Sequence, residues 1–262
     1  MENIVDIKDY NLAMQKTLLD KIWFLDKIDN SIKYIFDFGC ADGSLTKFIN
    51  EMFPDQFEFF LIDNNPEMLK IAEENIRDSS WTIRVHYCNS IDEAIAQCDE
   101  IKKSVLVLNS VIHEIMSYCT EEEKTNLFHE FFYHPFGYIA IRDMHLFNIP
   151  HFAIDSADQE VFNKFLDFAS NFTPNGMTMQ QMQLEFLLKT DYFNNWEREK
   201  KERYLWDWIE IVQGYTIGIY EIIWEEDFSL PYHRRKWYKK FKVSQTNKIA
   251  THKKLLLKSI DN

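Results

Sequence analysis

The chain of 262 residues is 46% apolar and 27% charged, and it carries a formal net charge of −13. This apolar content excludes an intrinsically disordered chain, and the length suits one large domain or a domain with an insertion. Four scattered cysteines without a C-x-x-C pair exclude a disulfide scaffold and favour a reduced, cytoplasmic setting. No apolar run approaches the roughly 18 residues of a membrane span, and the acidic first residues do not resemble a signal peptide. We therefore expect no membrane association.

The first 145 residues predict helices that alternate with short apolar strands. Residues 1–30 contain an amphipathic pattern over 11–28, which we interpret as an N-terminal helical lid. Strands are expected at 35–38, 57–62, 81–87, 105–108 and 138–142, with helices at 44–52, at 66–76, from 91, and after the capping box Thr120-x-x-Glu123. Over residues 31–145 this alternation predicts an α/β fold with a doubly wound, mostly parallel sheet.

The pattern changes after the fifth strand. Residues 156–213 are helical in pattern, and we expect a helical cap insertion over 146–202. Residues 203–262 are expected to form a last helix and two closing strands, at 216–224 and 250–258, joined through a basic loop.

The charge is unevenly distributed, because residues 225–262 carry a net charge of +6 and the remainder carries −19. The basic loop, residues 231–242, has six Lys or Arg side chains interleaved with aromatic ones. Stacking rings and phosphate-binding cations suit RNA, although the segment could equally hold a phosphorylated metabolite or pair with the acidic body. RNA binding would use Arg234, Arg235, Lys236, Lys239 and Lys240.

Two of the six glycines, Gly39 and Gly43, lie in the turn that follows the first strand. A strand–turn–helix junction at the carboxyl edge of a parallel sheet is where such folds bind ligands. Gly39 permits the turn, and Gly43 is expected to let the ligand approach the start of the helix. Asp37 can hold the turn or reach a cationic group of the ligand. Asp63 ends the second strand, where its carboxylate can accept hydrogen bonds from both hydroxyls of a ribose.

The run from Phe36 to Leu45 resembles the first motif of class I S-adenosylmethionine-dependent methyltransferases, D-x-G-x-G-x-G, with Ala41 in place of the middle glycine. Residues 61–69 resemble the second motif, which binds the ribose. The resemblance covers roughly residues 32–145 and the final strand pair. It implies a seven-stranded Rossmann-like sheet and S-adenosyl-L-methionine as cofactor. The implied cofactor contacts are Asp37, Gly39, Cys40, Ala41, Gly43, Asp63, Asn64, Met68, Asn89, Ser90 and Asn109, with Met68, Asn89 and Ser90 near the adenine.

Methyl transfer requires an acceptor placed in line with the sulfonium and, for a hydroxyl or ammonium acceptor, a base. His113, which follows the fourth strand, is a candidate base, and Glu114 could orient it or bind a cationic acceptor. The alternative is a structural histidine bonded to its loop. Asp143 and His145 follow the fifth strand and could serve the acceptor, unless Asp143 pairs with Arg142 to hold the loop.

The histidine spacing predicts no dedicated metal site, because there is no H-E-x-x-H motif. The sequence thus favours a methyltransferase for a small-molecule acceptor. The alternatives are an RNA or tRNA methyltransferase that uses residues 231–242, and a non-catalytic cofactor-binding partner protein.

Overall fold

The computed structural model describes residues 17–78, 82–148, 177–190, 195–241 and 249–260, together with residues 163, 165, 167, 168 and 192. Residues 1–16 of the expected lid and most of the first half of the expected insertion lie outside this description. Within the described chain, no helix is long and apolar enough to cross a membrane.

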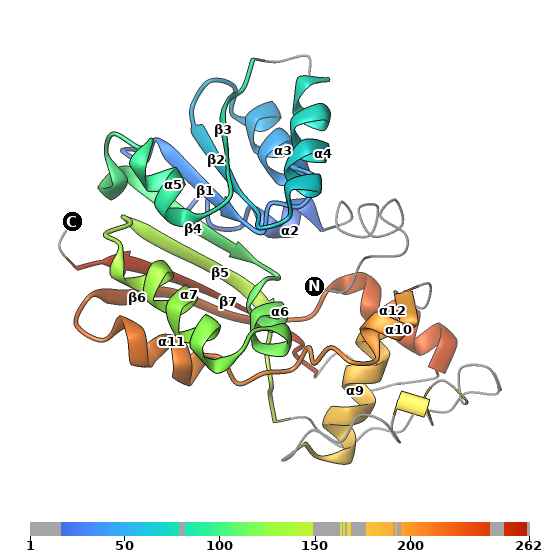
Figure 1. Ribbon diagram of the computed structural model, residues 1–262. Helices are drawn as coiled ribbons and strands as arrows, with labels where there is room; N and C mark the ends of the chain where they lie inside the picture. The colour runs from blue at the N-terminus through green and yellow to red at the C-terminus, as the bar shows by residue number, and fades with distance from the viewer. Residues whose placement is uncertain are drawn as a thin grey trace.

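A seven-stranded sheet in the order β3-β2-β1-β4-β5-β7-β6 forms the centre of the molecule (Figure 1). The first five strands pair in parallel, whereas β7 runs antiparallel to both β5 and β6. This order confirms the predicted doubly wound, mostly parallel, seven-stranded sheet. The strands are β1 (Tyr34–Phe38), β2 (Glu58–Ile62), β3 (Arg84–Cys88), β4 (Ser104–Asn109), β5 (Tyr138–Met144), β6 (Tyr220–Phe228) and β7 (His252–Ser259).

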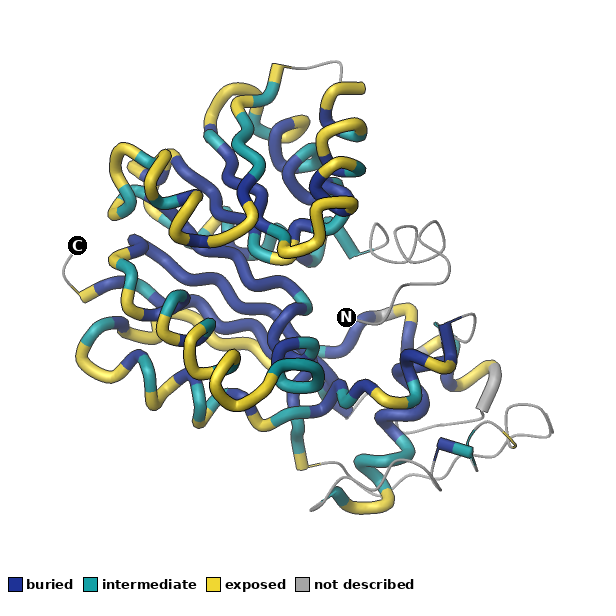
Figure 2. The backbone as a smooth tube through the Cα atoms, in the orientation of Figure 1, coloured by how far each residue is buried: buried dark blue, intermediate teal, exposed yellow. Residues whose placement is uncertain are grey.

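Alternate residues of the central strands enter two separate cores, one on each face of the sheet. Phe36 of β1 packs in one core and its neighbour Ile35 in the other, since successive side chains of a strand point to opposite faces. All six residues of β4 are buried, as expected for a parallel strand covered on both sides. Figure 2 shows this buried centre within a more exposed helical layer.

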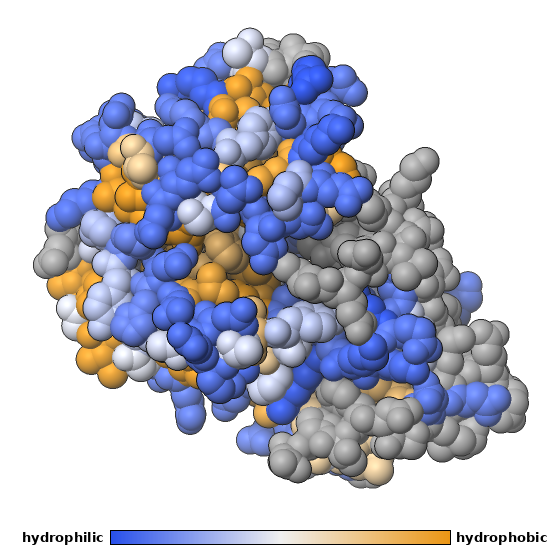
Figure 3. Space-filling view, in the orientation of Figure 1, coloured by the Kyte–Doolittle hydropathy of each residue, from blue (hydrophilic) through white to orange (hydrophobic). Residues whose placement is uncertain are grey.

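Helices from different parts of the chain cover the two faces. One core includes side chains of α3 (Ser44–Met52) and α4 (Pro66–Arg77). The opposite core includes side chains of α5 (Ile91–Ala96), α6 (Ile112–Tyr118), α7 (Glu121–Tyr133) and α11 (Ile209–Thr216). The predicted capping box is present at the start of α7, where Thr120 and Glu123 satisfy each other's backbone N–H groups. Mostly hydrophilic side chains cover the described surface of this side of the molecule (Figure 3).

A third apolar cluster lies beyond the carboxyl end of β5. It brings together α9 (Met179–Lys189), the segment around Tyr204 and Leu205, and α12 (Pro231–Phe241), which lie close to α10 (Trp196–Glu199) in Figure 1. We refer to α9, α10, the segment 200–206 and α12 as the cap. The cap therefore combines residues from the insertion and from the connection between β6 and β7.

Two sequence predictions are wrong in the cap. The basic segment 231–242 was expected to be a loop, but Pro231–Phe241 forms the helix α12. His233 and Trp237 are four residues apart, so they lie on one helical face, and both are buried. Residues 202–208 form no regular secondary structure instead of a helix, and the backbone N–H groups of Tyr204 and Leu205 donate to the carboxylate of Glu185.

The short helix α2 (Leu18–Lys21) is attached to the sheet by a charged residue. The carboxylate of Asp20 accepts a hydrogen bond of 2.6 Å from Arg142 Nε at the end of β5. It also lies 2.7 Å from Lys254 Nζ on β7. These two contacts place α2 directly beside the carboxyl ends of the strands.

The packing of α12 predicts opposite results for two neighbouring aromatic residues. Replacing the fully buried Trp237 by alanine should lower the free energy of unfolding by about 3–5 kcal/mol, because it leaves a cavity in the cap. Replacing Tyr238, which is 61% exposed, should change it by less than about 0.5 kcal/mol. Urea denaturation of both variants measures the difference. Equal losses would contradict the docking of this helix through Trp237.

Candidate active site

The turn between β1 and α3 has a left-handed backbone at three positions. Gly39, Ala41 and Gly43 have φ values of 71°, 49° and 70°. This conformation is easy for glycine but costs an alanine about 1–2 kcal/mol. The turn borders a small cavity, which we call the strand-one pocket. It is lined by Leu18, Lys21, Asp37, Gly39, Cys40, Ala41, Asp42, Ser44, Leu45 and Asn109.

Gly43 serves packing, contrary to its predicted role in ligand approach. A Cβ atom added at Gly43 would lie 3.2 Å from Ala72 Cβ and 3.2 Å from Ile76 Cδ1, both on α4. Gly43 is also absent from the lining of the strand-one pocket. The glycine therefore allows the start of α3 to approach α4 closely.

Two buried charged residues face the strand-one pocket from different elements. Burial, together with the nearby Arg142, lowers the pKa of Lys21 to about 8. Burial raises the pKa of Asp37 to about 7, although Lys21 opposes this shift. The sequence analysis missed Lys21. The pattern that could have indicated it is the position of this lysine on the same helical face as the apolar residues Leu18 and Leu25.

A second cavity, which we call the cap pocket, lies between the strand ends and the cap. It is adjacent to the strand-one pocket at two points of the chain. Thr17 and Ser110 line the cap pocket, whereas their neighbours Leu18 and Asn109 line the strand-one pocket. The cap pocket is lined by Thr17, Ser110, His113, Glu114, Arg142, Met144, Leu188, Tyr192, Arg198, Glu199, Glu202, Tyr204, Leu230, Tyr232, His233 and His252.

His113 and Asp143 form a buried ion pair at the base of the cap pocket. His113 Nδ1 lies 2.7 Å from Asp143 Oδ1, and the backbone N–H of His113 donates to Asp143 Oδ2 at 3.0 Å. Burial alone would lower the pKa of His113, but the carboxylates of Asp143 and Glu202 outweigh it and raise the pKa to about 9. This shift favours the imidazolium form of His113 at neutral pH.

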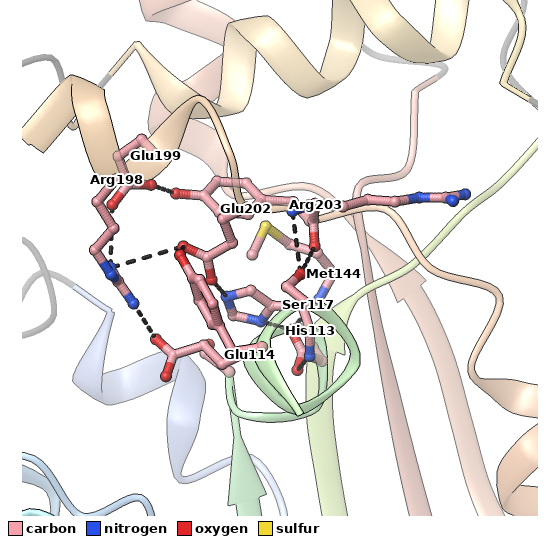
Figure 4. A network of polar contacts seen from close by, with 12 residues as sticks. His113, Glu114, Ser117, Met144, Arg198, Glu199, Glu202 and Arg203 are labelled. Carbon is pink, nitrogen blue, oxygen red and sulfur yellow. Dashed lines mark hydrogen bonds and ion pairs between the residues drawn. The ribbon is translucent and has the colours of Figure 1, made fainter. Parts of the chain in front are cut away.

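The other side of His113 faces acidic and basic side chains from the cap (Figure 4). His113 Nε2 lies 3.4 Å from Glu202 Oε1. Arg198 donates to Glu114 at 3.1 Å and to Glu199 at 3.2 Å. Since Glu114 lies on α6 and Arg198 on α10, this network joins the core of the fold to the cap.

The comparisons with known proteins agree with this geometry. Residues 35–134 match a family model described as a methyltransferase domain. They form a class I S-adenosylmethionine-dependent methyltransferase domain. The match begins in β1 and ends just after α7. It therefore includes the turn that borders the strand-one pocket and the residues after β4, among them His113. No curated protein sequence matches the chain.

Solved structures share the fold of this chain at low sequence identity. The PH0226 protein from Pyrococcus horikoshii OT3 is 10% identical with a TM-score of 0.51, over 97% of this chain and 93% of its own. The plantazolicin methyltransferase BamL, solved with a triazolic desmethylPZN analog and SAH, is 11% identical with a TM-score of 0.51, over 94% and 84% of the two chains. The small RNA methyltransferase HEN1 is 11% identical with a TM-score of 0.51, over 95% of this chain and 25% of its own. These structures are named for different acceptors, so they show the fold of this chain and assign it no acceptor.

Five of the residues expected to contact the cofactor line the strand-one pocket of the methyltransferase domain, namely Asp37, Gly39, Cys40, Ala41 and Asn109. Cys40 is buried, and burial raises the pKa of its thiol.

The remaining predicted contacts follow β2 and β3. Asp63 is half-buried and accepts a hydrogen bond from the backbone of Asn65 at 2.9 Å. Asn64 is exposed and Met68 is buried. Asn89 and Ser90 are exposed, and both bond to Glu93 at the start of α5.

The predicted catalytic residues separate into two groups. His113 and Glu114 line the cap pocket. Asp143 does not line it and contacts Nδ1 of His113. His145 does not line this pocket, because its ring packs against Trp208 and Phe147. The alternative pair of Arg142 with Asp143 is replaced by the pairs Arg142–Asp20 and Asp143–His113. Sequence reasoning missed Arg198, Glu199 and Glu202, which come from the cap and carry no motif.

The basic residues of α12 are only partly described. Arg235 and Lys239 are exposed and Lys236 is half-buried, whereas the side chains of Arg234 and Lys240 lie outside the description. These positions therefore stay compatible with an RNA contact and do not test it.

The left-handed turn predicts opposite effects for two substitutions. Gly43→Ala should destabilise the protein by about 1–2 kcal/mol or more, because the new Cβ adds contacts with α4 to the backbone strain. Ala41→Gly should leave the stability unchanged or raise it by up to about 1 kcal/mol, since relief of strain is partly offset by chain entropy. Urea denaturation provides both values. A clear loss of stability in Ala41→Gly would refute the assignment of strain.

The pair of His113 with Asp143 predicts a pH-dependent stability. Asp143→Asn should cost about 3 kcal/mol at neutral pH, because it leaves a buried imidazolium without its partner. The contribution of this pair is complete below the unfolded pKa of 6.5 and is lost as the pH rises through about 9. The difference between wild type and variant should therefore shrink between pH 6 and pH 10 in urea denaturation. As a control, Glu121→Gln removes an exposed partner of Lys124 and should show a small and nearly constant difference.

Proposed function

We propose that the protein transfers a methyl group from S-adenosyl-L-methionine in the strand-one pocket to a small-molecule acceptor in the cap pocket. The observation that carries this proposal is the shared wall of the two pockets. Because consecutive residues line one pocket each, at 17–18 and at 109–110, a donor and an acceptor bound there would face one another. Holding two reactants in line is a main source of rate in such a displacement.

The residues of the strand-one pocket fit the methionine part of this cofactor. Asn109 Oδ1 is buried and accepts no hydrogen bond from any described residue, so an ammonium group would satisfy it. Lys21 supplies a cationic nitrogen suited to the carboxylate of the cofactor. When bound, the cofactor supplies an electrophilic methyl group, and these side chains orient it.

The ribose is assigned to Asp63, at the end of β2. This position places a carboxylate next to the turn that carries Ala41, as the second motif requires. Asn64 and Met68 would border the nucleoside, and Asn89 and Ser90 the adenine. We further propose that the N-terminal segment, through α2, covers both pockets, and that the cap selects the acceptor.

The charge of His113 gives it an orienting role. A base must be free to accept a proton, whereas the raised pKa of His113 favours a proton on the ring nitrogen that faces Glu202. We therefore assign His113 to holding the wall of the cap pocket together with Asp143.

A small-molecule acceptor is favoured because the cap covers the pocket. Leu188, Tyr192 and Tyr232 line it from three separate segments of the cap region. A polynucleotide would need an open approach to the same wall. Because α12 carries exposed basic side chains, the test of the acceptor described below includes RNA.

Asp63→Ala should weaken the binding of S-adenosyl-L-methionine by about tenfold or more, because charge-assisted hydrogen bonds to the ribose are lost. Isothermal titration calorimetry on the full chain measures the affinity. Glu73→Gln is the matched control, since Glu73 is an exposed carboxylate on α4 that pairs with Arg77 of the same helix. Absence of binding to the wild-type protein would refute the assignment of the cofactor.

The class of acceptor is then determined by incubating the protein and a cell extract with methyl-labelled S-adenosyl-L-methionine and measuring which fraction takes up the label. Label should appear in a small-molecule fraction of a cell extract and be absent from RNA. Label in RNA that falls when Arg235 and Lys239 are neutralised, and that declines steeply with salt, would replace the small-molecule acceptor by RNA.

A further inference from the structure

His113, Glu114 and Glu202 bring three ligand atoms together at the base of the cap pocket. One ring nitrogen and one oxygen of each carboxylate all lie within 4.8 Å of one another. Glu202 is only 1% exposed, and its Oε1 accepts no hydrogen bond from the described residues although it faces His113 Nε2 at 3.4 Å. His113 Nε2 thus pairs with this oxygen by charge without a hydrogen bond, and a buried carboxylate oxygen in this position can serve as the ligand of a bound cation.

The orientation of His113 is the second observation. Asp143 accepts from Nδ1 at 2.7 Å and also from the backbone N–H of His113, which fixes the ring. Histidines that bind metals usually donate their other ring N–H to a carboxylate in this way. Nε2 is thereby directed at the two glutamates.

The charge balance of the network also favours an added cation. Four carboxylates, those of Glu114, Asp143, Glu199 and Glu202, face the two cationic groups of His113 and Arg198. All of these side chains except Glu114 are buried, so their excess negative charge is poorly solvated. A divalent cation that replaces the Nε2 proton of His113 would add one positive charge where the three ligand atoms meet.

We propose that His113 Nε2, Glu114 and Glu202 bind one divalent first-row cation, with Mn²⁺ and Zn²⁺ as the candidates. One imidazole nitrogen and two carboxylates match the preferences of these ions. Arg198 now contacts both glutamates, at 3.1 Å and 3.7 Å, and retains Glu199 as its partner when the cation enters. The remaining coordination positions face the cap pocket, where a hydroxyl or carboxylate oxygen of the acceptor would fit.

The metal site does not depend on the proposed methyl transfer. The histidine spacing in the sequence predicted no metal site. The reason is that Glu202 comes from the cap, far along the chain from His113 and Glu114, and only the folded chain brings the three together.

The test is a titration of the untagged, chelator-treated full chain with Mn²⁺. Electron paramagnetic resonance measures the concentration of free Mn²⁺ at each step. We expect one bound Mn²⁺ per chain, displaced by Zn²⁺, with electron spin-echo modulation from a directly bound nitrogen. Glu114→Gln and Glu202→Gln should each weaken binding by about tenfold or more. Glu197→Gln is the matched control, because it removes an exposed carboxylate of α10 that pairs with Lys200 and lies outside the network, and it should retain the ion.

Glu114 is half-buried, so its variant stays informative even where Glu202→Gln fails to fold, which thermal unfolding without metal reveals. Failure of Mn²⁺ and Zn²⁺ to bind stoichiometrically would overturn the proposal, and so would equal losses in Glu197→Gln and Glu114→Gln. The same preparation is titrated with S-adenosyl-L-methionine. Cofactor binding without metal binding would refute the metal site alone, and metal binding without cofactor binding would refute the proposed function alone.

Discussion

The buried ion pair of His113 with Asp143 is the interaction on which the site depends. Asp143 is fully buried at the end of β5, and both of its carboxylate oxygens contact His113. His113 lies in the first turn of α6, which follows β4. Removing one partner of such a pair leaves an uncompensated charge in a medium that solvates it poorly. The pair therefore fixes the ends of two neighbouring parallel strands relative to one another.

The pair also determines how the cap meets the core. Because Asp143 holds Nδ1, the opposite ring nitrogen faces Glu202 of the cap. Arg198 then connects Glu114 of α6 to Glu199 of α10. A polar network of this kind is costly unless its members are satisfied, so it specifies one arrangement of cap and sheet more sharply than apolar contact does.

A similar use of charge attaches the N-terminal helix. Asp20 binds Arg142 of β5 and Lys254 of β7, and this contact brings Lys21 into the strand-one pocket. The two pockets thus meet at the start of α2, where Thr17 lines the cap pocket and Leu18 lines the strand-one pocket. Arg142 takes part in both regions, since it contacts Ser110 at 3.1 Å and lines the cap pocket.

The sequence by itself determined the sheet, the helices that cover it and the turn after β1. These features depend on local patterns, such as apolar runs, a capping box and two glycines, which act over a few residues. It also grouped Asp37, Gly39, Ala41 and Asn109, which line one pocket, because parallel strands end at a common edge. Only the tertiary structure decided the partners of His113, the packing role of Gly43, and the conversion of the basic segment into the helix α12. Glu202, Arg198 and Lys21 reach the site from distant segments, and no local pattern encodes which distant charge a buried side chain will meet.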